Sequence, residues 1–180
     1  MHLVVMGVAG TGKTTVAERL VERLGWPFAE ADDFHPPANR EKMAAGRPLT
    51  DQDRLPWLQA LAAWAGERHA AGESTLSTCS ALRRSYRDLL RTGTPGTTFA
   101  HLAGDKDQLM ARMRGREHFF PPELLESQLD TLEPLEPDED GITVDVAAPV
   151  GEVADEIVRY LEQQPRGVGH PDETAGRSAD

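Results

Sequence analysis

The amino-acid sequence predicts an α/β fold in which helices cover both faces of a parallel sheet. Short apolar or β-branched runs alternate with segments of helical periodicity along the chain, an order that is typical of βαβ units. The first apolar run leads into a glycine-rich loop, which opens an amphipathic helix. A length of 180 residues suits one compact domain, which we place at 1–164.

The first elements are read from apolar spacing. Residues 2–6 form a continuous apolar run, as expected of a buried strand. Residues 13–24 carry apolar side chains at helical spacing until Gly25 ends the helix. A second strand is expected at 27–31, and the polar segment after it carries one short helix near 38–45.

The rest of the chain continues the alternation. Further strands are expected at 75–79, 97–102 and 142–146. Further helices are expected at 54–71, 83–90, 106–114 and 150–163. The third strand is unusually polar for a buried one, since it contains Ser77 and Thr78. An exposed arm is expected at 116–140, with its acid-rich part 130–140 as a solvated loop, and residues 165–180 are expected to be a disordered tail.

Composition argues against several classes of function. The formal net charge of −11 disfavours nucleic-acid binding, which needs a basic surface. No apolar run is long enough to cross a membrane and no leader peptide is recognisable, so we expect a cytoplasmic protein without membrane contact. Cys79 is the only cysteine, which excludes an internal disulfide and a cysteine-based zinc site. We expect this thiol to be buried and inert.

The loop at 7–14 carries the strongest motif. It reads Gly-Val-Ala-Gly-Thr-Gly-Lys-Thr and matches G-x-x-x-x-G-K-[ST] at every fixed position. Backbone N–H groups of such a loop surround phosphate oxygens, and the following helix N-terminus adds partial positive charge. Lys13 is expected to reach the β- and γ-phosphates, and the Thr14 hydroxyl to bind Mg²⁺. The residues expected to bind ATP in this loop are Gly7, Gly10, Thr11, Gly12, Lys13, Thr14 and Thr15.

Carboxylates lie at the end of the second predicted strand. Glu30, Asp32 and Asp33 lie where open α/β sheets bind their ligands, at the carboxyl ends of the strands. Such groups bind Mg²⁺ or accept a proton from an attacking hydroxyl. The alternative is a solvated acidic turn.

Four blocks resemble signature segments of the gluconokinase family. Residues 32–43 read Asp-Asp-Phe-His-Pro-Pro-Ala-Asn-Arg-Glu-Lys-Met, similar to the family's H-P-x-x-N-x-x-K-M. Residues 46–58 follow its G-x-P-L-x-D-x-D-R-x-P-W-L, and residues 79–91 follow its C-S-A-L-[KR]-[KR]-x-Y-R-D-x-L-R. The stretch 118–133 carries His-Phe-Phe, Ser-Gln and Thr-Leu-Glu in the order of the family's lid.

The resemblance implies a three-layer P-loop kinase fold of the nucleoside-monophosphate-kinase-like type. A substrate-binding segment would occupy about 33–54, and a lid about 115–140. The implied activity is phosphorylation of D-gluconate to 6-phospho-D-gluconate with ATP and Mg²⁺, in a homodimer. Closure of the lid would exclude water, which competes with the sugar hydroxyl for the γ-phosphate.

Roles follow from this resemblance and from side-chain chemistry. The residues expected to be catalytic are Lys13, Asp32 and Arg116, with Asp32 orienting or deprotonating the attacking hydroxyl. The residues expected to bind gluconate are Asp32, His35, Lys42, Arg54, Ser80, Arg83, Arg87 and His118. Arginine suits the carboxylate because its guanidinium offers a planar fork, although a surface ion pair is the alternative for each. Thr14 and Glu30 are the expected metal ligands, with Glu30 where relatives more often carry Asp.

The lid departs from the family pattern. The family usually carries Arg-x-x-His-Phe, whereas the interval from Arg116 to His118 is one residue shorter. Arg112 and Arg116 are expected to contact the phosphates, but the shorter interval leaves open which of Arg112, Arg114 and Arg116 enters the site.

Other functions remain as alternatives. A shikimate-kinase-like enzyme lacks support because no Gly-Gly pair occurs in the chain, and the motifs of residues 32–58 do not fit an adenylate kinase. A guanine-binding switch is disfavoured, since its Asn-Lys-x-Asp motif is absent. A non-catalytic nucleotide-binding regulatory module is the alternative from another class, and the intact Lys13, Thr14 and Asp32 count against it.

Overall fold

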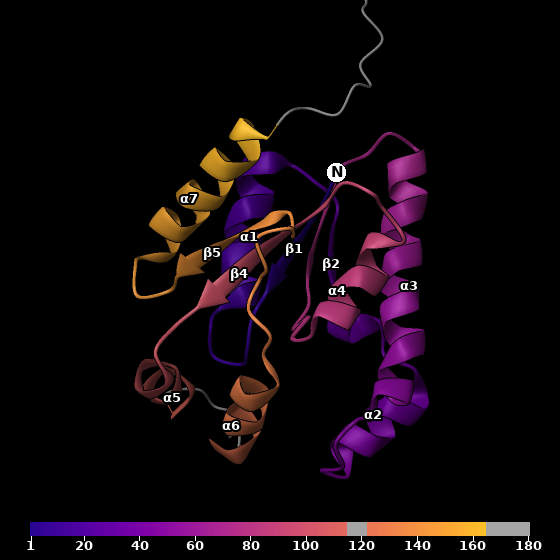
Figure 1. The fold of residues 1–180 in the computed structure, drawn as a ribbon, viewed down its shortest axis with the longest axis vertical. Coiled ribbons are helices and arrows are strands. Elements are labelled where there is room, and N and C mark those ends of the chain that lie inside the picture. Colours follow the sequence, from indigo (N-terminus) through magenta and orange to yellow (C-terminus); the bar gives the residue numbers. More distant parts are fainter. Residues whose placement is uncertain (115–121, 165–180) are drawn as a thin grey trace, which may run out of the picture.

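The computed structural model describes residues 1–114 and 122–164, which are built around a five-stranded sheet (Figure 1). The strands run in the order β2-β3-β1-β4-β5, and every neighbouring pair is parallel. The strands are β1 (His2–Met6), β2 (Phe28–Glu30), β3 (Thr75–Thr78), β4 (Thr97–Ala103) and β5 (Gly141–Asp145). The predicted parallel sheet is confirmed.

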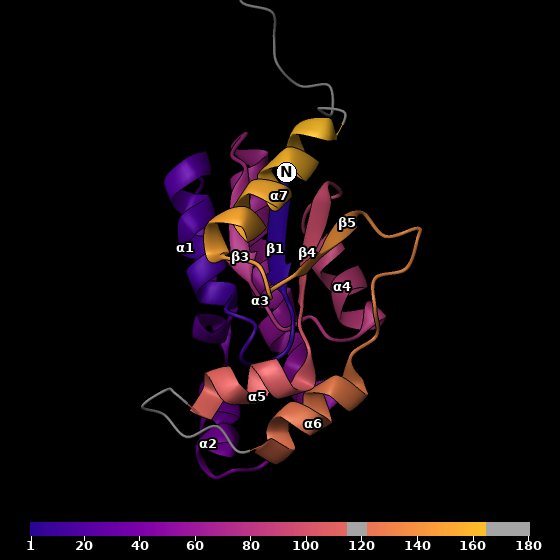
Figure 2. The ribbon, with the colours of Figure 1, turned by 90° about the vertical axis from the view of Figure 1, so that its left-hand side faces the viewer.

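Helices cover the sheet on both faces, as Figures 1 and 2 show from two sides. The helices on the faces are α1 (Lys13–Leu24) and α7 (Val150–Gln163) on one side, and α3 (Asp51–Ala70) and α4 (Arg84–Arg91) on the other. Successive residues of β1 point to opposite faces, so Leu3 and Val5 join the core under α1 and α7. Val4 and Met6 join the core under α3 and α4.

Further helices lie beyond the carboxyl ends of the strands, in the lower part of Figure 1. They are α2 (Pro37–Ala44), α5 (Lys106–Arg114) and α6 (Pro122–Thr131), and a 3₁₀ turn η1 (Ala31–Phe34) leads toward α2. The helix α6 corrects the expectation of an exposed arm, because Leu125 is fully buried in the core cluster that contains α1. The expected tail at 165–180 lies outside the described residues.

Local chemistry explains one boundary that differs from prediction. Helix α3 begins at Asp51, three residues before the expected start. The Thr50 hydroxyl oxygen accepts a hydrogen bond from the Asp53 N–H at 3.2 Å, and Asp53 Oδ2 accepts one from the Thr50 N–H at 2.9 Å. This reciprocal capping satisfies N–H groups at the start of the helix. No described helix is both long and apolar enough for a membrane span.

The polar third strand is satisfied by side chains of its neighbours. His2 of β1 places Nδ1 2.8 Å from Thr75 Oγ1 and Nε2 3.2 Å from Ser77 Oγ. On the other side, the Thr78 hydroxyl donates to Glu30 of β2. Because the buried hydroxyls have partners in adjacent strands, β3 can be polar without leaving unpaired groups in the core.

Candidate active site

The phosphate loop joins β1 to α1 and depends on glycine. Gly10 and Gly12 have φ values of 83° and 84°, a left-handed conformation that other residues rarely adopt. A Cβ atom on Gly7 would lie 2.7 Å from the carbonyl oxygen of Leu102, so the end of β4 passes too close for a side chain. The sequence motif therefore has the backbone shape that its glycines predict.

The polar side chains of the loop divide into two groups. Lys13 Nζ lies over the loop and donates to the Val8 carbonyl oxygen at 3.0 Å. The buried Thr11 hydroxyl donates to the same oxygen at 3.0 Å, so it supports the loop from inside. Thr14 and Thr15 are exposed in the first turn of α1. Their hydroxyl groups are therefore accessible to a ligand.

Helices α5 and α6 touch the loop directly. The Ala9 N–H donates to Gln128 Oε1 of α6 at 2.7 Å. A Cβ atom on Gly10 would lie 3.0 Å from Met113 Cγ of α5 and 3.2 Å from the Leu109 carbonyl oxygen. Gln128 was not among the expected site residues, although it belongs to the Ser-Gln pair of the lid block. That pair was the signal that could have identified it.

Two of the expected carboxylates differ in their surroundings. Asp32 is exposed in η1. Glu30 accepts a hydrogen bond from Thr78 with Oε2, whereas its Oε1 is buried and has no hydrogen-bond partner within 1–114 and 122–164. The pKa of the Cys79 thiol is raised to about 12, mainly by burial and to a smaller extent by the Asp32 carboxylate, against opposing effects of the Ala81 backbone and the Lys13 ammonium. Cys79 is buried, as expected, and its lack of reactivity stays a prediction.

His35 lies between the acidic turn and α3. Its ring stacks on Trp57 with centroids 4.2 Å apart and an interplanar angle of 19°. Nε2 lies 3.9 Å from Asp32 Oδ1, and Nδ1 lies 3.3 Å from Asn39 Nδ2. Burial lowers the pKa of His35, Asp32 opposes this shift, and Arg54 adds to it. His35 therefore places Asp32 and Arg54 in one neighbourhood, and its contact with substrate stays a prediction.

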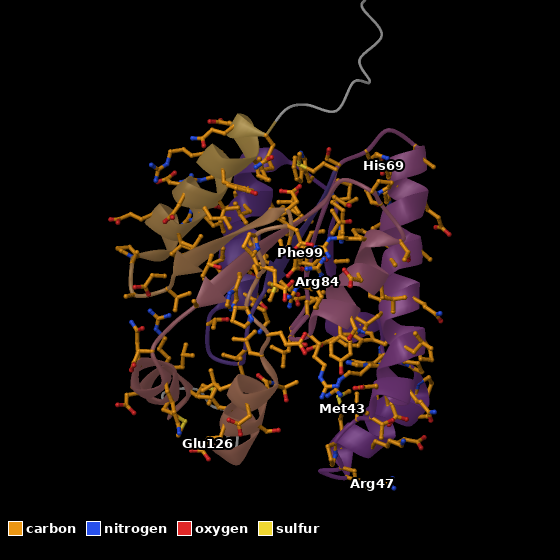
Figure 3. All side chains as sticks on the ribbon, viewed as in Figure 1. Met43, Arg47, His69, Arg84, Phe99 and Glu126 are labelled. Atoms are coloured by element: carbon orange, nitrogen blue, oxygen red, sulfur yellow. The ribbon has the colours of Figure 1, made fainter. Side chains whose placement is uncertain are left out.

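The predicted substrate segment is tied to α3. Lys42 Nζ of α2 donates to Asp53 Oδ1 at 2.6 Å, and Asn39 Nδ2 donates to the Asp53 carbonyl oxygen at 2.7 Å. Lys42 has its carboxylate partner inside the protein, so its contact with gluconate stays a prediction. Figure 3 shows Met43 and Arg47 of this segment on one side of the lower end of the molecule, with Glu126 of α6 on the other.

Arg54 and Arg83 meet at a tyrosine. Their guanidinium carbons lie 5.8 Å and 5.9 Å from the ring centroid of Tyr86. Arg83 Nη1 also donates to Asp51 Oδ2 at 2.9 Å. The structure therefore brings together two of the cations expected to bind the carboxylate of the substrate, on two different elements. Asp51, which lies between them, was not among the expected site residues.

Comparisons with known proteins show the family to which the chain belongs. A family model described as an AAA domain matches residues 3–135. A gluconokinase of Gluconobacter oxydans (strain 621H) is 48% identical over 163 residues, covering 90% of this chain and 92% of that protein. The thermoresistant gluconokinase of Escherichia coli (strain K12) is 45% identical, covering 89% and 93%. The chain belongs to the gluconokinase family.

Solved structures support the same family. The crystal structure of a gluconokinase from Sinorhizobium meliloti 1021 matches with a TM-score of 0.81 at 46% identity, covering 90% of this chain and 91% of that one. A shikimate kinase from Aquifex aeolicus vf5 matches with a TM-score of 0.57 at 19% identity, over 90% of this chain and 96% of that one, and shows the shared fold alone. The predicted P-loop kinase fold is confirmed.

The loop after β3 of this gluconokinase-family chain lies against the phosphate loop. The Gly7 N–H donates to the Ser80 carbonyl oxygen at 3.3 Å. The next residue, Ala81, has a φ of 44°, which is unusual for a residue with a side chain. The Ala81 carbonyl oxygen accepts a hydrogen bond from Arg87 Nη1 at 3.2 Å. Ser80 is therefore adjacent to the nucleotide site, and its contact with gluconate stays a prediction.

Arg87 is placed differently from expectation. Its side chain is fully buried, and all five of its N–H groups point to Glu139 or to carbonyl oxygens of Ala81, Glu133 and Pro134. No donor is left for a sugar acid, so an expected contact with gluconate does not fit this geometry. Arg87 instead holds the strained Ala81 loop in place, and Glu139 shows that the acid-rich run is only partly solvated.

The lid residues of the family are described only in part. Arg112 is exposed, and its Nη2 donates to the Val146 carbonyl oxygen at 2.6 Å, which ties α5 to the segment after β5. Its contact with the nucleotide phosphates stays a prediction. Arg116 and His118 lie outside the described residues.

Proposed function

We propose that this chain transfers the γ-phosphoryl group of ATP to D-gluconate and forms ADP and 6-phospho-D-gluconate. The observation that carries the proposal is the meeting of a phosphate loop and groups suited to a sugar acid at one end of the sheet. The Gly7 N–H of the loop donates to the Ser80 carbonyl oxygen at 3.3 Å, three residues before Arg83. Asp32 lies 3.9 Å from His35, whose ring stacks on Trp57 of α3, about one helical turn from Arg54. The membership of the gluconokinase family supports the same acceptor.

In the proposed step, the terminal hydroxyl oxygen of gluconate bonds to the γ-phosphorus while the bond from that phosphorus to the β,γ-bridging oxygen breaks. The hydroxyl proton passes to the Asp32 carboxylate, which is exposed and can release it to solvent. Lys13 and the N–H groups of the loop neutralise the phosphate oxygens as charge moves to ADP. Positioning and neutralisation dominate such reactions, so we expect Lys13 to matter more than Asp32.

Magnesium is expected to arrive with ATP, where it neutralises charge on the β- and γ-phosphate oxygens. In the part of the chain that the structure describes, no three His, Cys, Asp or Glu side chains form a metal cluster. This fits Mg²⁺, which keeps several waters and uses one or two protein groups in addition to phosphates. The exposed Thr14 hydroxyl would hold it, together with Glu30 Oε1, which has no partner among the described residues.

The remaining contacts with gluconate are expected from the family resemblance and from side-chain chemistry. Arg54 and Arg83 would bind the carboxylate of gluconate, and His35, Lys42 and Ser80 its hydroxyl groups. A homodimer and a cytoplasmic location belong to the same proposal, and sedimentation of the purified protein tests the first of them.

Turnover with a panel of acceptors tests the proposal. ADP release from Mg·ATP is measured with gluconate, other aldonates, shikimate, AMP and no acceptor. We expect gluconate-dependent release that Lys13→Ala abolishes, while Arg19→Ala, which removes an exposed side chain on α1, leaves it unchanged. Release with shikimate alone would indicate the other small-molecule kinase. Binding of ATP without turnover on any acceptor would favour a regulatory module.

A further inference from the structure

A carboxylate lies between the two arginines that are expected to bind substrate. Asp51 Oδ2 accepts a hydrogen bond from Arg83 Nη1 at 2.9 Å, and Oδ1 accepts one from the Tyr86 hydroxyl at 2.5 Å. Arg54 Nη1 lies 4.0 Å from the same Oδ1. These four side chains, Asp51, Arg54, Arg83 and Tyr86, are called the Asp51 cluster below.

The charged members of the Asp51 cluster are open to solvent. Their exposed side-chain fractions are 61% for Asp51, 41% for Arg83 and 31% for Arg54. A small ligand can therefore reach the guanidinium groups without displacing core residues. The Tyr86 hydroxyl fixes the carboxylate in place, and it is the main reason why the pKa of Asp51 is below its ordinary value. Asp51 thus stays ionised at neutral pH.

Counting charges gives the cluster a definite preference. Two guanidinium groups and one carboxylate leave a net charge of +1. Nearby groups do not change this balance, because Asp53 is paired with Lys42 at 2.6 Å. Asp32 lies 3.9 Å from His35, and among the described residues it forms no ion pair with Arg54 or Arg83. A ligand with one negative charge neutralises the cluster, whereas a second negative charge on the ligand is repelled by the Asp51 carboxylate.

We propose that Asp51 is a specificity-determining residue that sets this cluster to accept a monoanionic sugar acid and to discriminate against dianionic analogues. The inference rests on the proposed function, since it presumes that Arg54 and Arg83 face the carboxylate of the acceptor. A neutral polyol derivative gains no electrostatic binding energy from the net positive charge of the Asp51 cluster. A sugar diacid cannot use the second arginine while Asp51 occupies it, because like charges at close range repel.

A ligand series with one carbon skeleton and three charges tests this role. Binding of gluconamide, gluconate and glucarate is measured by calorimetry for the wild type and for Asp51→Asn. Asparagine keeps an acceptor oxygen for Tyr86 and Arg83 but removes the charge. We expect gluconate to bind best to the wild type. In Asp51→Asn, glucarate should gain about two- to fivefold relative to gluconate, the range expected for one exposed charge pair.

Two further variants make the result decisive. Asp155→Asn is the matched control, because it removes an exposed carboxylate that pairs with Arg23 and is not part of the Asp51 cluster. This variant should bind the three ligands in the same order of affinity as the wild type. Asp51→Ser removes the charge with a different side chain, and it should show the same gain for glucarate if Asp51→Asn folds poorly. Thermal midpoints of all variants report on folding.

The opposite outcomes overturn the inference. An unchanged ratio of glucarate to gluconate affinity in both Asp51 variants means that the carboxylate does not set the charge preference. An equal loss for all three ligands means that Asp51 supports the fold or contacts a hydroxyl group instead. Failure of the proposed function is recognised separately, because wild-type protein then produces no gluconate-dependent ADP while the binding series still reports on the cluster.

Discussion

Arg87 of α4 and Glu139 form a bidentate ion pair in which neither side chain has any exposed surface. Arg87 Nε and Nη2 donate to the two carboxylate oxygens at 2.7 Å each. Arg91 Nη2 adds a third hydrogen bond to Oε1 at 2.8 Å. Burial alone would raise the pKa of Glu139, but these hydrogen bonds and one from the Glu136 N–H lower it to about 2. The pair therefore connects the last part of the predicted lid segment to α4 in its charged form.

Removal of one partner should be costly. Arg87→Met leaves the Glu139 carboxylate buried without its main partner, and we expect the free energy of unfolding to fall by about 3–5 kcal/mol. Urea denaturation followed by circular dichroism measures this change. The double variant Arg87→Met/Glu139→Leu should recover most of the loss, because no buried charge remains.

Arg84→Met is the matched control, since its partners Asp88 and Asp138 are largely exposed. It should lower the free energy of unfolding by about 1 kcal/mol or less. An equal cost for Arg84 and Arg87 would contradict this account.

Close packing between α3 and the turn after α4 gives a second prediction. A Cβ atom on Gly93 would overlap the Ala62 carbonyl oxygen and lie 2.6 Å from its carbon, and backbone cannot move aside easily. We expect Gly93→Ala to lower the free energy of unfolding by about 3 kcal/mol. Gly96→Ala is the control in the same turn, because the nearest atom to its Cβ would be Met1 Cα at 4.0 Å. Thermal unfolding of both variants checks this, and similar midpoints would count against the packing argument.

His2 should make stability depend on pH. Burial lowers the pKa of His2 to about 4, and the positive N-terminus adds to this shift against a hydrogen bond with Thr75. The unfolded chain, with a pKa near 6.5, binds a proton between pH 6.5 and 4 that the folded protein does not. The contribution of His2 to stability is thus complete above about pH 6.5 and declines as the pH falls toward 4.

The size of this effect can be measured with one substitution. Between pH 7 and pH 5, His2 should account for a loss of about 2 kcal/mol in the free energy of unfolding. In His2→Gln the decline over the same interval should be smaller by that amount, whatever the absolute stability of the variant. Urea denaturation at several pH values gives both curves. Parallel curves would show that His2 does not titrate on unfolding.

Local patterns in the sequence were sufficient for most of the fold. The phosphate loop is recognisable because its glycines and Lys13 lie within eight consecutive residues, and β1 is recognisable as one apolar run. The start of α3 was also readable in principle, since Thr50 and Asp53 form a capping box that lies entirely within the local sequence. The prediction of the fold therefore rested on patterns among residues that are near each other in the chain.

Long-range partners explain what the sequence could not reveal. Arg87 was expected at the substrate because its planar guanidinium suits a carboxylate, but its partner Glu139 lies 52 residues away. The polar strand β3 had no explanation until His2, 73 residues from Thr75, proved to be its partner. The segment of α6 was expected to be exposed. Its apolar residues pack against parts of the core that are distant in the sequence, so the local sequence did not indicate their burial. Pairings of this kind depend on the assembled sheet.

The contact between Gln128 and the phosphate loop leads to the last prediction. In Gln128→Ala, the Ala9 N–H loses its 2.7 Å hydrogen bond, and α6 loses a direct connection to the loop predicted to bind ATP. We expect kcat/KM for ATP to fall about tenfold, which corresponds to the free energy of one well-formed hydrogen bond. The thermal midpoint should change only slightly. Steady-state kinetics at saturating gluconate measures this change.

Two variants decide whether Gln128 acts through the loop. Ser127→Ala alters the exposed neighbouring residue and should leave kcat/KM unchanged. Gln128→Glu keeps an acceptor for Ala9 but brings a negative charge to the phosphate loop, so its KM for ATP should rise more than that of Gln128→Ala. If Gln128→Ala lowers the thermal midpoint without changing kcat/KM, the side chain only fastens α6 to the domain. A loss that is specific to ATP, and absent in Ser127→Ala, instead ties the lid helix to nucleotide binding through this one amide.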